Sequence, residues 1–486
     1  MSEVPLSHPV PQRLRRVRRI PWLEVVAGLL APVMGVWLGR QLTSDNWTSW
    51  VTLIGVAFHV VAVVVNPLAG LLLYAITAPY ARFVYLDIDM GGGIPDLGLN
   101  RVVAGTLVLV FLANLALRRW RMRRLGVLEL TFVLFVGAMF ASAADSVFGI
   151  VNAIQTTFDA YVIPFFFFFA ARHLVRREET MRWVIGTFLI VGIYLALITV
   201  REQWTGEILF DIGYSYPMYS AHIRKVVGLL GIPTFMGMSL AIIAPIALYQ
   251  LVRARTLAAR GLLACIFGFV LVGVFNTYAR AGWLGTVLAL IIMGLLDQRT
   301  RRVLIPLGLA AAVFTIVSWN SIITSYAVTE RLTAENSLDF RITAWQISAR
   351  IIQESPILGI GFNSFGYVAQ YRWGWTPFII PGISAATHNT LLFIFTSAGF
   401  LGVLPYVAFC FLVLYGIWQQ YRRARARPTA NDPGIFALGI AVFMAYMAPS
   451  LTVDMPFGFF VNTLFFLFTG AVLGLIPDQE ARKSDV

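Results

Sequence analysis

Two arginines and one histidine lie in otherwise apolar stretches and could carry chemistry. Arg280 stands in "FNTYARAGWLG" (275–285), Arg341 in "DFRITAW" and His388 in "AATHNTLL". A guanidinium group stays charged at physiological pH and binds phosphate through two parallel hydrogen bonds. It can therefore stabilise a leaving pyrophosphate, while a histidine can accept a proton from an attacking hydroxyl or orient it. These residue types predict a site for a phosphate-linked substrate, if the chain brings them together.

The composition places these residues in a membrane protein. Of 486 residues, 58% are hydrophobic and 13% are charged, which leaves too little polar surface for a soluble globule. Apolar runs of roughly 20 residues recur along the chain, each long enough to cross a hydrocarbon core of about 30 Å. A β-barrel would show alternating segments of about 10 residues instead. The sequence therefore predicts an all-α polytopic integral membrane protein.

The apolar runs predict twelve to fourteen transmembrane helices, and a count of fourteen gives a consistent topology. The spans are 22–40, 50–65, 67–86, 101–117, 127–144, 150–171, 181–200, 233–252, 259–277, 282–296, 303–319, 388–417, 434–451 and 457–475. With these spans the arginine-rich connections all fall on one face, namely 13–19, 118–124, 172–182, 253–260, 299–302 and 422–427. Cytoplasmic loops carry the excess of Lys and Arg, so that face and both termini are predicted to be cytoplasmic.

The same count divides the chain into five regions. They are a basic N-terminus 1–21, a transmembrane region 22–319 of about eleven spans, a large outer loop 320–387, C-terminal spans 388–475 and a tail 476–486. Within the outer loop we expect an amphipathic helix capped by Asn336, with Asp339 at its third position and Pro356 ending it. Phe340, Ala344, Ile347 and Ile351 then recur at helical spacing.

Several basic residues break the charge bias, because the topology puts them on the outer face. They are Arg280, Arg341, Arg224, Lys225 and Arg372, and His222 and His388 are the histidines on that side. A charged group near hydrocarbon is costly and usually has a reason. The alternatives to phosphate binding are snorkelling to headgroups or pairing with a carboxylate. Either of these two alternatives suits Arg372, which stands beside three aromatic residues, and His388 could equally be a hydrogen-bonded structural residue.

Other signals are weaker. Asp87 and Asp89 have the D-x-D spacing of a metal site, but that spacing is common by chance. Asp159 lies inside a predicted span, where a carboxylate is either functional or paired with a buried arginine. Cys265 and Cys410 are expected to be buried thiols in spans, without a disulfide framework. The net charge of +13 lies mostly in clusters between spans, which argues against a nucleic-acid partner.

Four segments resemble elements of the bacterial O-antigen ligase and O-antigen polymerase superfamily, and they occur along the chain in the family's order. "YARAGWLG" looks like its S-R-x-x-W-L-G element, and "FRITAWQISARIIQESPILGIGFNSF" looks like its R-x-x-x-W followed by P-L-x-G-x-G. "THNTLLFIFTSAGFLGVLPY" is similar to its H-N-x-x-L element, and "AHIRKVVGLLGIPTFMG" resembles its R-x-x-G segment before a span. The resemblance covers residues 222–415, and the outer loop has the family's position.

The resemblance implies an inverting GT-C glycosyltransferase in the bacterial inner membrane, with its active site at the periplasmic face. It implies a polyprenyl-diphosphate-linked glycan donor, a glycan or lipid-linked acceptor, contact with membrane lipids, and no metal or other cofactor. It also admits a chain-length regulator as a partner. By the same resemblance Arg280 and Arg341 contact the diphosphate, His388 activates or positions the acceptor, and Arg224 is a further phosphate-facing candidate.

Three functions remain open. Fourteen spans favour a polymerase that joins repeat units of an O-antigen or exopolysaccharide over a ligase that moves finished glycan to lipid A-core or another acceptor. A transporter or flippase of lipid-linked sugars would show pseudo-symmetric halves with broken helices at midplane, and the two halves of this chain differ.

Overall fold

The computed structural model describes residues 47–81, 83, 97–118, 125–209, 219–220, 223–319, 335–375, 387–426 and 432–475. Its α-helices are α2 (Trp47–Val65), α3 (Pro67–Thr77), α4 (Leu99–Ala116), α5 (Val127–Ser142), α6 (Ile150–Thr157), α7 (Ile163–Leu174), α8 (Glu178–Thr205), α9 (Pro233–Leu251), α10 (Leu257–Asn276), α11 (Arg280–Leu296), α12 (Gln298–Val317), α15 (Glu335–Glu354), α16 (Phe365–Trp373), α17 (Thr390–Ala426), α18 (Pro433–Ser450) and α19 (Phe459–Gly474). Short turns of helix are η1 (Ala78–Tyr80), η2 (Ala143–Asp145), η3 (Phe158–Val162), η4 (Gly228–Leu230) and η5 (Met455–Phe457). Strands β1 (Tyr219–Ser220) and β2 (Ile223–Arg224) pair antiparallel, with Tyr219 opposite Arg224.

The membrane-protein prediction is confirmed. In the described residues nine helices are long and apolar enough to cross a bilayer: Leu99–Ala116, Val127–Asp145, Ile150–Leu174, Glu178–Thr205, Pro233–Leu251, Leu257–Asn276, Gln298–Val317, Thr390–Ala426 and Pro433–Ser450. Four shorter apolar helices are Trp50–Val65, Pro67–Tyr80, Arg280–Leu296 and Phe459–Gly474. Each of these helices overlaps one of the predicted spans, and the first predicted span, 22–40, lies in the part that is not described.

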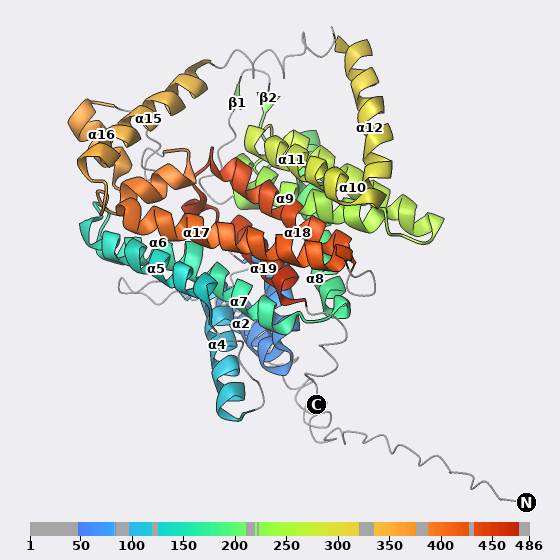
Figure 1. Cartoon of the computed structure of the whole chain (residues 1–486), viewed down its shortest axis with the longest axis horizontal. Coiled ribbons are helices and arrows are strands. Elements are labelled where there is room, and N and C mark those ends of the chain that lie inside the picture. Colours follow the sequence, from blue (N-terminus) through green and yellow to red (C-terminus); the bar gives the residue numbers. More distant parts are fainter. Residues whose placement is uncertain are drawn as a thin grey trace, which may run out of the picture.

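The helices pack as a bundle around α9, α18 and α19. Figure 1 shows α5 and α17 side by side, and α17 also contacts α18, while α11 packs on both α9 and α18. The apolar window of α9 is 83% buried inside the protein, whereas that of α12 is 6% buried. A helix that is apolar all round is stable when buried or in contact with lipid. The central helices therefore form the protein core, and α12 has the surface of a lipid-facing span.

The span predicted at 388–417 is not one straight helix, because α17 breaks at Gly399. This glycine has φ +59° and ψ −154°, a backbone conformation that residues with a Cβ atom rarely adopt. An added Cβ would lie 2.2 Å from the carbonyl carbon of Ile357. The segment after α15 fills the break, with Ile360 N–H donating to the Thr396 carbonyl (2.8 Å) and Phe400 N–H to the Pro356 carbonyl (2.8 Å). The "PILGIG" stretch therefore anchors the outer loop into the break of α17.

The predicted amphipathic helix is present as α15, and its apolar face is buried. Ala344, Ile347 and Ile351 form a small core with Phe365 and Ala369 of α16. The cap prediction is wrong, because Asn336 lies within α15, whose first residue is Glu335. The helix ends at Glu354, two residues before Pro356, as a following proline requires. Two helices with their own core thus form the described part of the outer loop.

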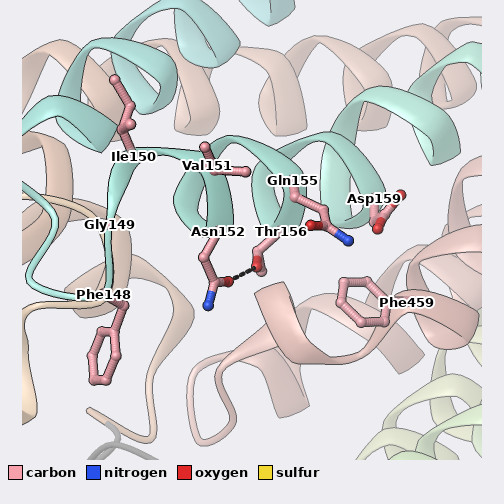
Figure 2. A pocket seen from close by; sticks show the side chains of 9 residues that line it. All are labelled: Phe148, Gly149, Ile150, Val151, Asn152, Gln155, Thr156, Asp159 and Phe459. Atoms are coloured by element: carbon pink, nitrogen blue, oxygen red, sulfur yellow. Dashed lines mark hydrogen bonds between the residues drawn. The ribbon is translucent and has the colours of Figure 1, made fainter. Parts of the chain in front are cut away.

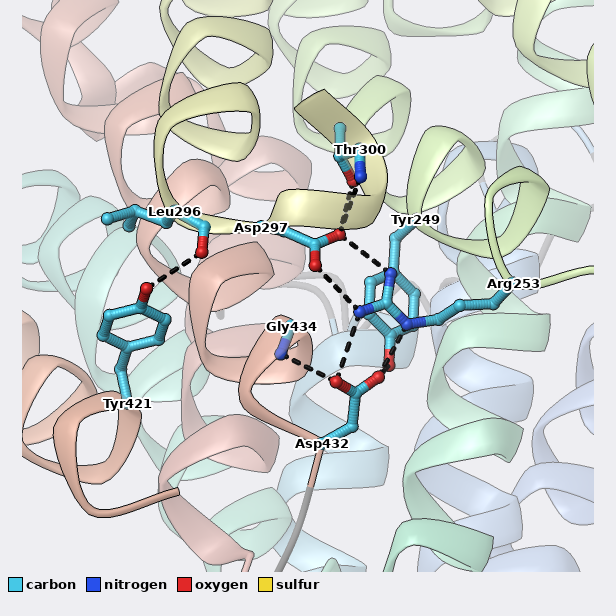
Figure 3. A network of polar contacts seen from close by, with 8 residues as sticks. All are labelled: Tyr249, Arg253, Leu296, Asp297, Thr300, Tyr421, Asp432 and Gly434. Carbon is cyan, nitrogen blue, oxygen red and sulfur yellow. Dashed lines mark hydrogen bonds and ion pairs between the residues drawn. The ribbon is translucent and has the colours of Figure 1, made fainter. Parts of the chain in front are cut away.

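A polar network joins the residues that follow α9 and α11 to the start of α18 (Figure 3). Arg253 pairs with Asp297 (Nη1 to Oδ2, 3.0 Å) and with Asp432 (Nε to Oδ2, 2.6 Å), and its guanidinium lies 3.9 Å from the Tyr249 ring centroid. Asp297 follows the last residue of α11, and Arg280 is the first residue of the same helix. At 1.5 Å per residue, the network and Arg280 are about 25 Å apart along the helix axis. The two ends of α11 are therefore chemically different, one anchored by ion pairs and the other carrying the candidate arginine.

The two thiols differ from each other. Cys410 is buried, as predicted, but Cys265 is exposed on the outside of α10. In a membrane protein that surface is open to lipid, and so the burial prediction for Cys265 is wrong.

Candidate functional site

Arg280 stands at the start of α11, on a turn held by its own side chains. Thr277 Oγ1 accepts the Ala279 N–H (3.3 Å) and donates to the Val274 carbonyl (2.7 Å). Trp283 Nε1 donates to the same carbonyl (3.2 Å), and its ring stacks on Phe275 at 5.6 Å between centroids. Arg280 itself is exposed. The apolar and aromatic residues of "FNTYARAGWLG" thus hold the turn that precedes exposed Arg280.

Arg341 lies in the second turn of α15, close to Arg280 in space. Burial lowers the pKa of the Arg341 guanidinium, the positive charge of Arg280 lowers it further, and the Asp454 carboxylate acts in the opposite direction. Arginine nevertheless remains protonated in proteins. An anion bound near exposed Arg280 and half-buried Arg341 would reduce the repulsion between the two cations. The fold therefore brings together the two arginines that the sequence singled out, 61 positions apart.

His388 occupies a strained turn directly before α17. Its φ is +50°, in the left-handed region that costs a non-glycine residue roughly 1–2 kcal/mol. Asn389 caps the helix, accepting from the Leu391 N–H (2.9 Å) and the Leu392 N–H (3.2 Å). The imidazole packs edge-on against Phe340 of α15, at 5.4 Å between centroids. This packing joins the histidine to the helix that carries Arg341.

Asp454 holds the His388 turn, and sequence reasoning missed it. Its Oδ1 accepts from Thr387 Oγ1 (2.7 Å) and from the Asn389 N–H (2.9 Å), and its Oδ2 accepts from the His388 N–H (3.0 Å). The carboxylate is 4% exposed. The available signal was an aspartate in the short connection 452–456, on the same predicted outer face as His388. Only the fold shows that this connection lies against a residue 66 positions earlier.

The ionisation of His388 reflects these neighbours. Burial lowers the pKa of the imidazole below its usual 6.5, the negative charge of Asp454 opposes this, and the positive charge of Arg341 lowers it further. The ring is therefore neutral at neutral pH. A neutral imidazole can accept a proton, which is the state that a general base requires.

The segment after β2 lies near the same turn. Val226 N–H donates to the Asn276 carbonyl (3.3 Å), four residues before Arg280. The buried carboxylate of Glu202 accepts from the Val227 N–H (3.1 Å) and the Gly228 N–H (2.8 Å), which fixes this segment on the end of α8. Arg224 is placed in β2 by its backbone alone, so its predicted role toward phosphate stays a prediction.

The other candidates lie elsewhere. Arg372 forms an ion pair with Glu354, which is one of the two alternatives to phosphate binding. Asp159 pairs with Arg101 (Oδ2 to Nη2, 2.6 Å), which confirms the pairing alternative for this intramembrane carboxylate. Asp87, Asp89 and His222 are outside the described residues, and within the described part no three His, Cys, Asp or Glu residues are grouped as metal ligands.

The arrangement places two guanidinium groups and a neutral imidazole near one another. Arg280 and Arg341 supply two permanent positive charges, and His388 lies within electrostatic reach of Arg341. Residues 263–407 match a family model described as O-antigen ligase. This segment is therefore similar to the O-antigen ligases. Arg280, Arg341 and His388 all lie inside the matched range, whereas Arg224 and Asp454 lie outside it.

The similarity to O-antigen ligases is limited to this segment, which is about a third of the chain. The resemblance seen in the sequence is therefore confirmed for this region. No curated protein shows significant similarity to the chain. The match covers the helices from α10 to the first part of α17, including the described outer loop between them.

Proposed function

We propose that the protein is an inverting glycosyltransferase that uses a polyprenyl-diphosphate-linked oligosaccharide at the periplasmic face of the bacterial inner membrane. Its preferred reaction is polymerisation of repeat units of a surface polysaccharide, either an O-antigen or an exopolysaccharide. The observation that carries the proposal is the electrostatic proximity of Arg280, Arg341 and His388, three residues drawn from separate elements of the segment that is similar to O-antigen ligases.

In this proposal the two guanidinium groups bind the diphosphate of the donor. An acceptor hydroxyl attacks the anomeric carbon from the opposite side, a glycosidic bond forms, and the bond to the diphosphate oxygen breaks. The electron pair leaves on the diphosphate, where Arg280 and Arg341 stabilise the developing charge. The hydroxyl proton passes to the neutral ring of His388. The products are the extended glycan and the polyprenyl diphosphate.

The proposed topology agrees with the two ends of α11. The network of Arg253, Asp297 and Asp432 belongs to the arginine-rich connections, and a cytoplasmic position follows for it from the charge bias. Arg280 at the other end would then face the periplasm, and both chain termini would be cytoplasmic. Cysteine labelling from either side of the membrane tests this orientation, and external labelling of a cysteine placed at exposed Arg255 would contradict it.

The alternative product is a single transfer of finished glycan onto lipid A-core or another acceptor, and the description of the matched family favours it. Purified protein is mixed with labelled polyprenyl-diphosphate oligosaccharide, with and without an acceptor lipid. A ladder of products identifies a polymerase, and one product that requires the acceptor lipid identifies a ligase. Absence of transfer refutes the proposed function and favours a transporter. Loss of transfer with chelator would assign a metal role to Asp87 and Asp89.

The roles of the arginines are tested in the same assay. Arg280→Ala and Arg341→Ala should each lower transfer at least 100-fold, since each removes charge stabilisation from the leaving group. Arg341→Lys should also be poor, because an ammonium group does not replace the guanidinium fork. Arg350→Ala is the matched control, since Arg350 is exposed on the same helix as Arg341. Full activity of Arg341→Ala would remove this arginine from the proposed mechanism.

A further inference from the structure

A second site opens beside the first half of the helix Ile150–Leu174. It is an open cavity of about 700 Å³, whose lining residues Figure 2 shows. The lining residues that bear on its chemistry are Asn152, Gln155, Thr156, Asp159, Phe148 and Phe459. It lies on the side of the outer loop, because Val147 N–H donates to Ser364 Oγ (3.2 Å) and Phe362 N–H donates to the Ser142 carbonyl (3.0 Å).

The polar lining follows one face of the helix. Asn152, Gln155, Thr156 and Asp159 stand at positions i, i+3, i+4 and i+7, which share a helix face. Figure 2 shows these side chains toward the cavity, with Thr156 Oγ1 donating to Asn152 Oδ1 at 3.1 Å. Nearby Ile154 is an exposed apolar residue, 40% accessible. Polar groups in a membrane span face a water-filled cavity or a ligand, since hydrocarbon offers them no partner.

The charge of the cavity excludes a phosphate ligand. Asp159 accepts from Arg101 Nε (3.0 Å) and forms the ion pair with Arg101 Nη2, and Asn100 Nδ2 donates to the same carboxylate (3.2 Å). The positive charge of Arg101 is therefore balanced within the wall. The remaining polar groups are amides and a hydroxyl, which both donate and accept hydrogen bonds. With the rings of Phe148 and Phe459, they match an uncharged ligand that has hydroxyl groups and apolar faces, such as a sugar.

A short segment connects this cavity to the candidate active site. Asp454 holds the His388 turn, and Phe459, five residues later, lines the cavity. Five steps of 3.8 Å limit the separation of their Cα atoms to about 19 Å. The segment is fixed between them, because Asn462 Nδ2 donates to the Ala160 carbonyl (2.9 Å) and to the Met455 carbonyl (3.0 Å). A glycan of a few sugars can extend over that length.

We propose that this cavity binds neutral sugars of the acceptor glycan and so holds the acceptor hydroxyl at His388. The inference rests on the proposed glycosyl transfer and adds a substrate subsite to it. The diphosphate of the donor is bound by Arg280 and Arg341, and the uncharged acceptor glycan lies along the stripe from Asn152 to Asp159. The acceptor is therefore recognised by hydrogen bonds and ring contacts, without a charge.

The test measures binding of a probe without phosphate groups, which therefore has no group for Arg280 and Arg341 to bind. The probe is the oligosaccharide released from the lipid-linked repeat unit by mild acid, free of lipid and phosphate. It is titrated into the full-length protein in lipid nanodiscs by calorimetry. The double variant Asn152→Leu, Gln155→Leu should weaken binding at least tenfold, since it removes two sets of hydrogen bonds. Ile154→Ala, on the exposed side of the same turn, and Arg350→Ala, at an exposed position of α15, should bind the probe as the unaltered protein does.

Two results would overturn the subsite. One is the absence of saturable binding to the unaltered protein, and the other is unchanged affinity in the double variant. If that variant does not elute as a single species in detergent, Thr156→Val replaces it, because valine keeps the shape of threonine and loses only the hydroxyl. Transfer from lipid-linked donor is assayed separately on the unaltered protein. Failure of transfer refutes the proposed function, while transfer without probe binding refutes only the subsite.

Discussion

Replacement of Asp454 by asparagine tests whether the geometry of the His388 turn matters for the reaction. Asparagine keeps the shape of the side chain but has one carbonyl oxygen in place of two carboxylate oxygens. The oxygen can stay where Oδ1 accepts from Thr387 Oγ1 and the Asn389 N–H, and the amide then faces the His388 N–H, donor against donor. In the opposite orientation the amide faces the Asn389 N–H, donor against donor, while Thr387 Oγ1 can turn to accept from the amide. Either way the His388 N–H or its neighbours lose a charged acceptor.

The expected loss of transfer rate in Asp454→Asn follows from the number of hydrogen bonds that are lost. One hydrogen bond to a charged group contributes about 1.5–3 kcal/mol. The loss falls on a residue held at φ +50°, a conformation that is itself unfavourable, so the turn should relax and the imidazole should leave its position. With a factor of ten for each 1.4 kcal/mol, transfer should fall roughly 10- to 100-fold. The rate is measured with saturating lipid-linked donor in nanodiscs.

The control for this experiment is Glu354→Gln. It removes one carboxylate charge from the outer loop, at an exposed ion pair with Arg372 whose contribution is about 1 kcal/mol or less. It should leave the transfer rate within twofold, and both variants should elute from size exclusion as folded protein. A fully active Asp454→Asn variant would refute the reasoning, because the turn would then hold His388 without the carboxylate.

Three further predictions concern ionisation and packing. Burial lowers the pKa of His388 below 6.5, and the neutral ring is the proposed base. The transfer rate should therefore stay at its maximum at neutral pH and halve only below pH 6.5. A midpoint above 6.5 in a pH–rate profile would contradict the role of His388 as the base. Arg253→Ala leaves buried Asp297 and half-buried Asp432 without their cation and should cost about 3 kcal/mol, the lower end of the range for a buried pair. The loss should appear as a lowered Tm in detergent, and an unchanged Tm would show that the network is not stabilising. Gly282→Ala places a Cβ 2.8 Å from the Gly237 backbone and should lower stability by about 1–3 kcal/mol. The control Gly268→Ala has open space around the added Cβ and should not lower stability. Equal Tm values for the two variants would refute the close packing of α11 on α9.

The positions of the membrane helices followed from the sequence because each span is long and apolar. A bilayer requires a continuous apolar run with its backbone hydrogen bonds satisfied inside the helix, so hydropathy alone locates it. The same reasoning located α15, since Ala344, Ile347 and Ile351 recur at helical spacing and their face is indeed buried. The break of α17 at Gly399 escaped prediction, because it depends on the backbone of residues 356–361 filling the gap.

For the site, the sequence by itself determined which residue types were available. Arg280, Arg341 and His388 stood out as charged or titratable groups in apolar surroundings, because such groups are costly near a membrane. Distances between segments are not encoded in local patterns, however, and only the tertiary structure brought α11, α15 and the start of α17 together. It also decided that Asp159 and Arg372 are paired with opposite charges, and that Asp454 holds the turn of His388. The physical reason is that pairing and capping depend on contacts between residues far apart in the chain, which become defined only when the helices pack.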